Sequence, residues 1–336
     1  MARALDLAAV LIVRNEARCL ARCLASVKHW VDRIVVVDTG STDATVSIAL
    51  AAGAQVHHMV WPDDFAAARN HALACADAAW NLIIDADEWI EQGGAALRAF
   101  CEGEERLGRL CVISNDDTDP TNPQEVRSWI TRLIPRGARF AGRIHEQVDS
   151  SLPRHDLPVL IGHDGYLAAQ RIGKQSRNLP LLLAELAAQP EDAYIQFQLG
   201  KDAESYGHHA QACEWYAKAL TRTPRAPWRH DLVVRHLHCL GQTGRLDEAL
   251  QLAEAEAPDY AASPDLFFVL GNLCLDSAMV DPAHAITHWI PRAIEAWQTC
   301  LAIGERPDLE GSVTGRGSHL AQHNLQALQG GLASVS

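Results

Sequence analysis

The stretch that decides the fold is AAVLIVRNEARCLARCLASVKHWVDRIVVVDTGSTDAT, residues 8–45. It holds two short apolar runs, residues 8–13 and 33–38, and between them residues 16–30 carry leucine and valine at helical spacing. Uninterrupted apolar runs predict strands that are buried on both faces, and a helix that connects two of them predicts parallel pairing. The stretch therefore predicts the beginning of an α/β sheet with helices on both faces.

The same alternation continues to residue 85. The expected elements are a helix, a strand, a helix and a strand at residues 42–52, 54–60, 64–79 and 80–85. Residues 109–165 are then rich in β-forming side chains, whereas the chain from about residue 175 onward is rich in alanine and leucine at helical spacing. We therefore expect an α/β domain over residues 1–174 and an all-α domain over residues 175–336.

The helical half shows a weak internal repeat. Leu199-Gly200 and Leu270-Gly271 are 71 residues apart, which is about two units of the roughly 34-residue tetratricopeptide repeat. Tyr216 follows the first pair in a pattern that resembles the small and aromatic residues of that repeat. We expect tetratricopeptide-like helical hairpins, and an irregular helical bundle is the alternative.

Composition limits the classes of function. The chain has 336 residues, with 29 Lys and Arg against 42 Asp and Glu, and a net charge of −13 at pH 7. A nucleic-acid-binding protein needs a basic face for phosphates, so we expect no nucleic-acid partner. No apolar run is long enough to span a membrane, and the nine cysteines form no C-x-x-C pair. We therefore expect a soluble, cytoplasmic protein with reduced thiols and no integral membrane segment.

Polar side chains follow the predicted strands at their carboxyl ends, where open α/β sheets bind ligands. Asn15 and Glu16 follow the first strand, Asp38 ends the second, and Asp85-Ala86-Asp87 ends the fourth. Asp85 and Asp87 are hard oxygen donors, which suits Mn²⁺ or Mg²⁺ on a diphosphate, and a helix cap is the alternative for Asp87. No glycine-rich loop follows the first strand, which argues against a dinucleotide-binding dehydrogenase, a P-loop enzyme and a sugar nucleotidyltransferase.

Three linked motifs carry a resemblance to a known family. Residues 11–45, DFAAARNHAL at 64–73 and LIIDADE at 82–88 resemble, in order and spacing, the nucleotide-sugar domain of family 2 glycosyltransferases. RFAGRIHEQV at 139–148 and IGHDGY at 161–166, followed by tetratricopeptide-like helices, are similar to a bacterial subgroup. That subgroup includes S-glycosyltransferases of bacteriocin peptides and lipopolysaccharide-core transferases. The resemblance implies a GT-A-type domain with a mixed sheet, followed by the helical domain.

The resemblance also implies a function, which is inverting, metal-dependent transfer of a sugar from a nucleotide-diphosphate sugar, with a UDP-sugar as the expected donor. The acceptor is expected to be a peptide or protein that the helical domain docks, and the same domain is a candidate for homodimer formation. A glycan acceptor, such as a lipopolysaccharide core, is the first alternative. The second alternative is a non-catalytic interaction protein with a retired transferase domain.

The family's nucleoside pocket is implied at five positions of this chain. Asp38 would accept a hydrogen bond from the nucleobase, Glu16 and Arg69 would line the pocket, and Asn15 would hold the turn. Asp85 would reach the ribose or the metal. For Asp38 the alternative is a turn or helix cap, and for Arg69 it is a solvated helix face.

Asp87 and His163 are the metal ligands that the resemblance implies, with a buried strand histidine as the alternative for His163. Asp164 departs from the aromatic residue that the family pattern leads us to expect at that position. Glu146 is the expected catalytic base, because an inverting transfer needs a carboxylate that takes the acceptor's proton. Its rivals are Asp149, Asp116 and Asp117.

Five arginines and no acidic residue lie in the segment 127–143. They are Arg127, Arg132, Arg136, Arg139 and Arg143. In an acidic chain this local reversal of sign suits a diphosphate or an anionic acceptor. Alternation on an exposed hairpin is the alternative.

Overall fold

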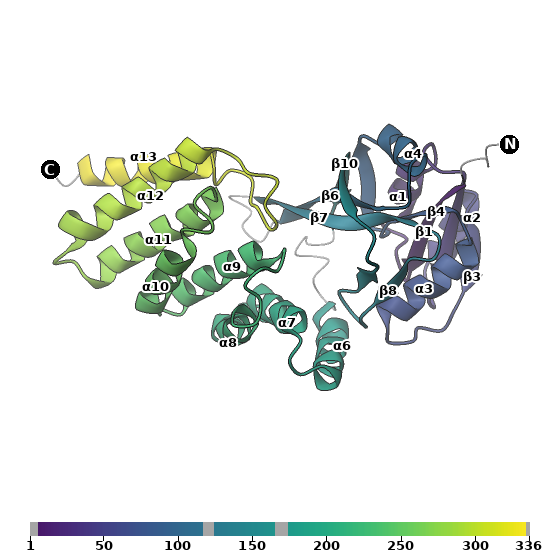
Figure 1. Ribbon diagram of the computed structural model, residues 1–336, viewed down its shortest axis with the longest axis horizontal. Coiled ribbons are helices and arrows are strands. Elements are labelled where there is room, and N and C mark those ends of the chain that lie inside the picture. The colour runs from purple at the N-terminus through teal and green to yellow at the C-terminus, as the bar shows by residue number, and fades with distance from the viewer. Residues whose placement is uncertain (1–5, 117–123, 165–173, 334–336) are drawn as a thin grey trace. The chain divides into compact units, whose positions relative to one another are not determined.

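The computed structural model describes residues 6–116, 124–164 and 174–333 (Figure 1). The chain divides into two compact units, Met1–Glu185 and Leu186–Ser336, which we call the N-terminal unit and the helical unit. This division lies within helix α6 (Lys174–Ala188), whereas the boundary expected between residues 174 and 175 lies at the beginning of that helix.

Parallel strands form the first half of the sheet in the N-terminal unit. They are β1 (Leu7–Val13), β2 (Arg33–Asp38), β3 (Gln55–His58) and β4 (Trp80–Ile83), in the order β3-β2-β1-β4. Each of these strands is parallel to its neighbours within this group. The α/β sheet predicted from the first 85 residues is therefore confirmed.

The second half of the sheet contains strands of both directions. They are β5 (Glu88–Gln92), β6 (Leu107–Asp116), β7 (Gln124–Pro135) and β10 (Arg154–His163), and they complete the order β3-β2-β1-β4-β7-β6-β10-β5. β7 is antiparallel to β4 and β6, whereas β10 is antiparallel to β5 and parallel to β6. The expected mixed sheet is confirmed. β8 (Arg139–Ala141) and β9 (Gln147–Asp149) pair antiparallel in a separate two-stranded sheet.

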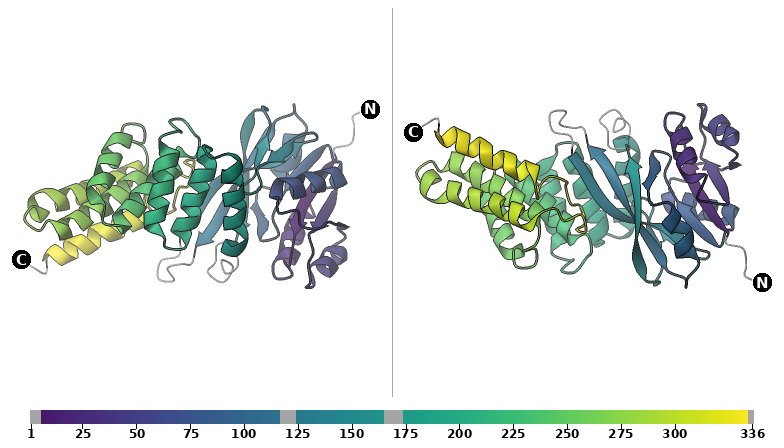
Figure 2. Two further views of the ribbon diagram at one scale, coloured as in Figure 1. Left: turned by 90° about the horizontal axis from the view of Figure 1, so that it is seen from below. Right: turned by 90° about the horizontal axis from the view of Figure 1, so that it is seen from above.

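Helices cover both faces of the sheet, and the side chains of β1 alternate between the two cores that lie on these faces. Leu7, Ala9 and Leu11 belong to one core, together with side chains of α1 (Leu20–Val27), α2 (Thr45–Ala51) and α4 (Ala95–Cys101). Ala8 and Val10 belong to the other core, to which α3 (Phe65–Ala76) contributes. Successive strand residues point to opposite faces, so a continuous apolar run fills both cores. Figure 2 shows the same sheet and helices from two further sides.

The helical unit is built from helices that pack against their neighbours in sequence from α7 to α13. They are α7 (Ala193–Ser205), α8 (His209–Leu220), α9 (Arg229–Gln242), α10 (Leu246–Glu256), α11 (Pro264–Val280), the π-helical segment η1 (Ala285–Trp289), α12 (Ile290–Ile303) and α13 (His319–Ala333). The all-α region expected after the sheet domain is confirmed.

Two glycines let paired helices approach each other closely. A Cβ atom at Gly200 in α7 would lie 2.3 Å from the ring of Tyr216 in α8, and one at Gly271 in α11 would lie 2.4 Å from the indole of Trp297 in α12. Both aromatic side chains are fully buried. The same glycine–aromatic contact therefore recurs in two helix pairs, which confirms the tetratricopeptide-like packing expected from the two Leu-Gly pairs.

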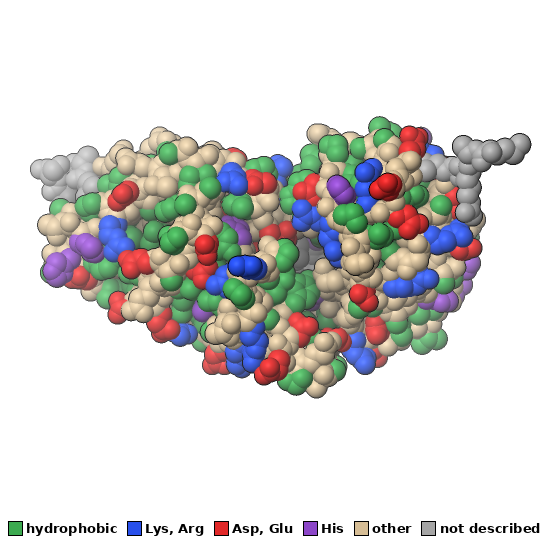
Figure 3. All heavy atoms as spheres, viewed as in Figure 1, with side chains coloured by type: hydrophobic (Ala, Val, Ile, Leu, Met, Phe, Trp, Pro, Cys, Tyr) green, Lys and Arg blue, Asp and Glu red, His purple; other side chains and the backbone are tan. Residues whose placement is uncertain are grey.

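Acidic and basic side chains are interspersed on the surface that Figure 3 shows, without one large patch of either sign. Within the part of the chain that the structure describes, no helix has both the length and the apolar character needed to cross a membrane. All nine cysteines are free thiols.

Candidate active site

The loops at the carboxyl ends of β1 and β2 are bound to each other. The backbone N–H of Asn15 donates to Oγ of Ser41 (2.9 Å), and the backbone N–H of Thr42 donates to Oδ1 of Asn15 (2.8 Å). Asn15 has a φ of 57°, in the left-handed region that asparagine adopts more readily than most residues. Asn15 therefore ties together the two loops in which nucleoside contacts are expected.

Glu16 lies in the loop after β1. Its backbone N–H donates to Oγ1 of Thr45 (2.7 Å), and the thiol of Cys19 donates to its Oε2 (3.3 Å). A second thiol, that of Cys23, donates to the backbone carbonyl of Asp85 (3.3 Å). The beginning of α1 thus contacts the loops that follow β1 and β4. The nucleoside contact expected of Glu16 stays a prediction.

Asp38 ends β2 and is buried. Its carboxylate accepts hydrogen bonds from the backbone N–H groups of Gly40 and Ser41, each at 3.2 Å, and Nδ1 of His58 lies 3.5 Å away. Burial raises the pKa of Asp38, but the hydrogen bonds from Ser41 and Gly40 outweigh it, so the pKa lies below its ordinary value. Asp38 caps its own turn, which is the alternative named for it, and the nucleobase contact stays a prediction.

Arg69 connects two of the predicted site carboxylates. It lies in α3 with 7% of its surface exposed, so the solvated helix face is wrong for this residue. Its Nη2 donates to Oδ1 of Asp85 (2.8 Å), and its Nε donates to Oε1 of Glu146. The guanidinium of Arg69 therefore joins three parts of the chain: the motif around residue 69, the segment after β4, and the loop between β8 and β9.

Asp85 is bound from its other side by Arg132 in β7, whose Nη2 lies 2.9 Å from Oδ2. The same Nη2 donates to Oε1 of Glu88 (2.5 Å), and the backbone N–H of Asp85 donates to Oε2 of Glu88 (3.0 Å). Burial raises the pKa of Asp85, but Arg69 and Arg132 outweigh it and hold that pKa well below its usual range. Burial is also the largest influence on Glu88, and with the neighbouring Asp85 it raises the pKa of Glu88 against the attraction of Arg132.

The sequence did not distinguish Glu88 as a site residue, nor Arg132 from the other arginines of segment 127–143. β7 pairs with β4 and β6, whereas β8 pairs with β9, so this segment is divided between two sheets. The arginines have different partners. Arg136 and Arg139 donate to backbone carbonyl groups, and Arg143 pairs with Glu185 at 3.6 Å. The sequence marks Glu88 only by its position, directly after the Asp-Ala-Asp motif, where the edge strand β5 begins.

Asp87 and His163 face each other, with 3.5 Å between Oδ2 and Nε2. The hydroxyl of Ser114 lies 2.9 Å from Nδ1 of His163, so a hydrogen bond orients the ring with Nε2 toward Asp87. Among the described residues, no three His, Cys, Asp or Glu side chains come together as a metal-binding set. Mg²⁺ and similar ions are commonly held by one or two protein side chains together with substrate phosphates and water. The pair therefore fits a metal that is shared with a diphosphate.

The candidate bases differ in their surroundings. The side chain of Glu146 is 10% exposed and is joined to Asp85 through Arg69. Asp149 ends β9 with an exposed side chain opposite Arg139. Asp117 and the side chain of Asp116 lie outside the described part of the chain. Of the candidates whose side chains are described, Glu146 is the one in contact with the other predicted site residues.

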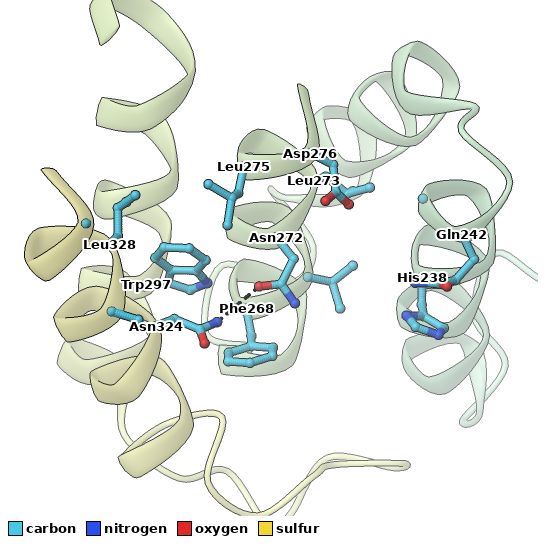
Figure 4. Close-up of a pocket in the computed structure, with 14 residues that line it drawn as sticks. His238, Gln242, Phe268, Asn272, Leu273, Leu275, Asp276, Trp297, Asn324 and Leu328 are labelled. Atoms are coloured by element: carbon cyan, nitrogen blue, oxygen red, sulfur yellow. Dashed lines mark hydrogen bonds between the residues drawn. The ribbon is translucent and has the colours of Figure 1, made fainter. Parts of the chain in front are cut away.

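The helical unit contains a cavity of about 800 Å³ (Figure 4). Its walls come from α9, α11, α12 and α13, and they combine apolar side chains with amide side chains, His238 and the carboxylate of Asp276. The labelled lining residues include His238, Gln242, Phe268, Asn272, Leu275, Trp297, Asn324 and Leu328. Nδ2 of Asn324 donates to Oδ1 of Asn272 (3.1 Å). Such walls offer both hydrogen-bond donors and acceptors to a ligand, and Asp276 adds one carboxylate.

The N-terminal unit is thus an α/β domain with polar residues at the carboxyl ends of its parallel strands, the edge at which open α/β sheets bind ligands. Residues 8–137 match the family model described as Glycosyl transferase family 2.

Two curated relatives extend this similarity. A "TPR repeat-containing protein Synpcc7942_0270" of Synechococcus elongatus is 37% identical over 261 residues, which are 73% of this chain and 64% of that protein. The "SPbeta prophage-derived glycosyltransferase SunS" of Bacillus subtilis is 26% identical over 219 residues, which are 62% of this chain and 52% of that protein. The matched part of the chain thus spans between half and two thirds of the length of these relatives.

Solved structures share less with the chain. Glucosyl-3-phosphoglycerate synthase from Mycobacterium tuberculosis, in complex with Mn²⁺, UDP and glucosyl-3-phosphoglycerate, is 24% identical, with a TM-score of 0.28 over 32% of this chain and 44% of that one. MamA from Desulfovibrio magneticus RS-1 is 19% identical, with a TM-score of 0.33 over 40% of this chain and 68% of that one. TM-scores this low carry no argument about the site.

Removing Glu88 should destabilise the N-terminal unit. In Glu88→Ala the buried guanidinium of Arg132 keeps Asp85 but loses its other carboxylate, and breaking a buried ion pair in this way costs about 3–5 kcal/mol. Glu88→Gln retains an oxygen acceptor and should lose less. Urea denaturation followed by circular dichroism measures the free energy of unfolding.

The matched control is Arg98→Ala, which removes a partly exposed ion pair with Asp32 (2.6 Å) and should cost less than about 1 kcal/mol. Equal losses in Glu88→Ala and Arg98→Ala would contradict a stabilising contribution of the buried cluster.

Proposed function

We propose that the chain is a metal-dependent, inverting glycosyltransferase that uses a nucleotide-diphosphate sugar, with a UDP-sugar as the candidate donor. One observation carries the proposal: the ion pairs of Arg69 with Asp85 and Glu146 lie in the same unit as the facing pair of Asp87 and His163. The family match of residues 8–137 supports it, as does the similarity to a relative whose name is glycosyltransferase SunS.

In this proposal the nucleoside binds at the loops after β1 and β2. Asp38, with its orientation fixed by the N–H groups of Gly40 and Ser41, accepts a hydrogen bond from the base. Asn15 and Glu16 border the pocket. Arg69 lines the pocket and fixes the orientation of Asp85 through their ion pair. The Asp85 side chain is 33% exposed, and its accessible part contacts the ribose.

Asp87 and His163 are the residues that would hold Mn²⁺ or Mg²⁺. A metal there would neutralise the charge that develops on the diphosphate leaving group. Asp85 is less suited as a ligand, because both of its oxygens already accept hydrogen bonds from arginines.

Glu146 is proposed as the base. The acceptor's oxygen or sulfur forms a bond to the anomeric carbon as the bond from that carbon to the diphosphate breaks, and Glu146 takes the acceptor's proton. A single displacement of this kind inverts the anomeric centre. The hydrogen bond from Nε of Arg69 fixes the orientation of the Glu146 carboxylate.

The helical unit is proposed to dock a peptide acceptor in the cavity bordered by Asn272 and Asn324. Amide side chains match the donors and acceptors of a peptide main chain, and the apolar walls can take side chains. A glycan acceptor and self-association of the chain are the other uses considered for this unit.

Asp87→Ala should abolish metal-dependent donor binding while the protein stays folded. A ligand present at 100 times its Kd stabilises the folded state by about 2.7 kcal/mol, which a thermal shift detects. We expect UDP and one or more UDP-sugars to raise the Tm of the wild type in the presence of Mn²⁺, and this rise to be absent in Asp87→Ala. The exposed Glu102→Ala is the control and should behave as the wild type. Full activity in Asp87→Ala would refute the metal assignment.

Glu146→Gln should retain donor binding and lose transfer. The amide oxygen of glutamine can still accept from Arg69, but it cannot take a proton at neutral pH, and a general base contributes about 10²–10⁴-fold to the rate. Transfer to candidate peptides is measured by mass spectrometry, and UDP binding with Mn²⁺ by calorimetry. Asp149→Asn is the matched control. Normal transfer by Glu146→Gln would place the base elsewhere.

Asn272→Ala with Asn324→Ala should weaken acceptor binding alone. The loss of one or two neutral hydrogen bonds, at about 1 kcal/mol each, should raise the KM for a peptide acceptor by roughly 5- to 30-fold and leave UDP binding unchanged. His323→Ala, an exposed change on the same helix, is the control. An unchanged KM would contradict docking in the cavity, and dissociation of a dimer in size-exclusion chromatography would assign the cavity to self-association.

A further inference from the structure

Asp164 directly follows His163 and is held by two arginines, Arg18 just before α1 and Arg22 in its first turn. Nη1 and Nη2 of Arg18 donate to the two oxygens of Asp164, each at 3.0 Å, and Nη2 of Arg22 donates to Oδ2 at 2.6 Å. The Asp164 side chain is 11% exposed, whereas those of Arg18 and Arg22 are 43% and 45% exposed. One carboxylate thus receives three charge-assisted hydrogen bonds, the strongest kind that side chains form.

The backbone of Asp164 is also hydrogen-bonded to Asp87, a member of the candidate metal site. Its N–H donates to the carbonyl oxygen of Asp87 (3.3 Å), and the preceding residue, His163, lies opposite Glu88 in the β5–β10 pairing. Asp164 is therefore bonded to Asp87 through the main chain and adjacent to His163 in sequence. A displacement of Asp164 would move both members of the facing pair.

Packing also holds Arg22 in this place. The guanidinium of Arg22 stacks over the ring of Trp89 at 3.8 Å, and Trp89 fills the space above Gly162, where a Cβ atom would lie 2.2 Å from the ring. Gly162, Trp89, Arg22 and Asp164 thus form one continuous set of contacts between α1, β5 and the end of β10. These contacts join α1 to Gly162 and Asp164, the two residues on either side of His163.

We propose that Asp164, clamped by Arg18 and Arg22, is a positioning residue that sets the separation and orientation of Asp87 and His163 for a divalent ion. This inference rests on the proposed function, because it concerns the metal site assigned there. Asp164 contacts no reacting atom. It acts through its hydrogen bond to the main chain of Asp87 and through its covalent link to His163. Arg18 and Arg22 anchor Asp164, and with it the metal site, to the start of α1.

The test compares binding of Mn²⁺ together with UDP in the wild type and in Asp164→Ala, measured by calorimetry. Loss of a group that orients metal ligands lowers metal affinity by about 10- to 100-fold, so we expect a weakening in that range. UDP binding without Mn²⁺ should change by less than about twofold, which separates a positioning role from a general loss of structure. Circular dichroism and the Tm without ligand establish that the variant is folded.

Two further variants sharpen the test. Arg18→Ala with Arg22→Ala should weaken Mn²⁺–UDP binding as Asp164→Ala does, and adding Asp164→Ala to that pair should weaken it little further, because all three changes remove the same contact. Asp164→Glu keeps the charge and should recover part of the affinity. The matched control is Asp156→Ala, which removes a two-bond contact with Arg109 (2.6 and 2.9 Å) at the other end of β10 and should leave the affinity unchanged.

The outcomes distinguish the inference from the function on which it rests. Wild-type affinity in Asp164→Ala, when the wild type binds Mn²⁺–UDP, overturns the positioning role and leaves the proposed function standing. Equal losses in Asp164→Ala and Asp156→Ala overturn it as well, since the effect would then be unspecific. If the wild type binds neither Mn²⁺ nor UDP, the proposed function fails and the inference fails with it.

Discussion

The carboxylate of Asp85 lies between two guanidiniums, and the arrangement of the N-terminal unit around its site depends on that contact. A charged group at the end of a buried strand is costly to remove from water unless oppositely charged groups surround it. Arg69 and Arg132 supply that charge from α3 and β7, and each also binds another carboxylate, Glu146 or Glu88. The cluster therefore joins the parallel half of the sheet to the mixed half at the point where the predicted motifs meet.

The sequence predicted those parts of the fold that have a local signal. The apolar runs of β1 and β2 are continuous because both faces of these strands are buried, and a continuous run is visible without knowledge of any partner. The Asp-Ala-Asp motif was visible for the same reason, since it directly follows such a run. The repeat of Leu-Gly pairs revealed the helical unit because Gly200 and Gly271 occupy equivalent places in two helix pairs.

What the sequence did not show depends on pairing between distant segments. Arg132 and Arg136 lie four residues apart in the same arginine-rich segment, yet Arg132 enters the buried cluster while Arg136 donates to a backbone carbonyl group. Only the antiparallel register of β7 against β4 and β6 separates the two, and no local pattern encodes that register. Glu88 was hidden in the same way, because its burial comes from β10 on one side and Arg132 on the other.

Cys19 directly precedes α1, and Cys23 lies in its first turn. A group-transfer enzyme must keep its own nucleophilic side chains from attacking the reactive donor that it binds. A thiol is a strong nucleophile only as the thiolate. Burial, with Glu16 as its neighbour, raises the pKa of Cys19 to about 12, and burial raises that of Cys23 well above its ordinary value. Both sulfurs also donate hydrogen bonds, to Glu16 and to the Asp85 carbonyl, and so are held in the protonated form at neutral pH. Under the proposed function, these cysteines therefore contact Glu16 and Asp85 of the candidate nucleoside pocket, and as buried, protonated thiols they do not act as nucleophiles toward the donor.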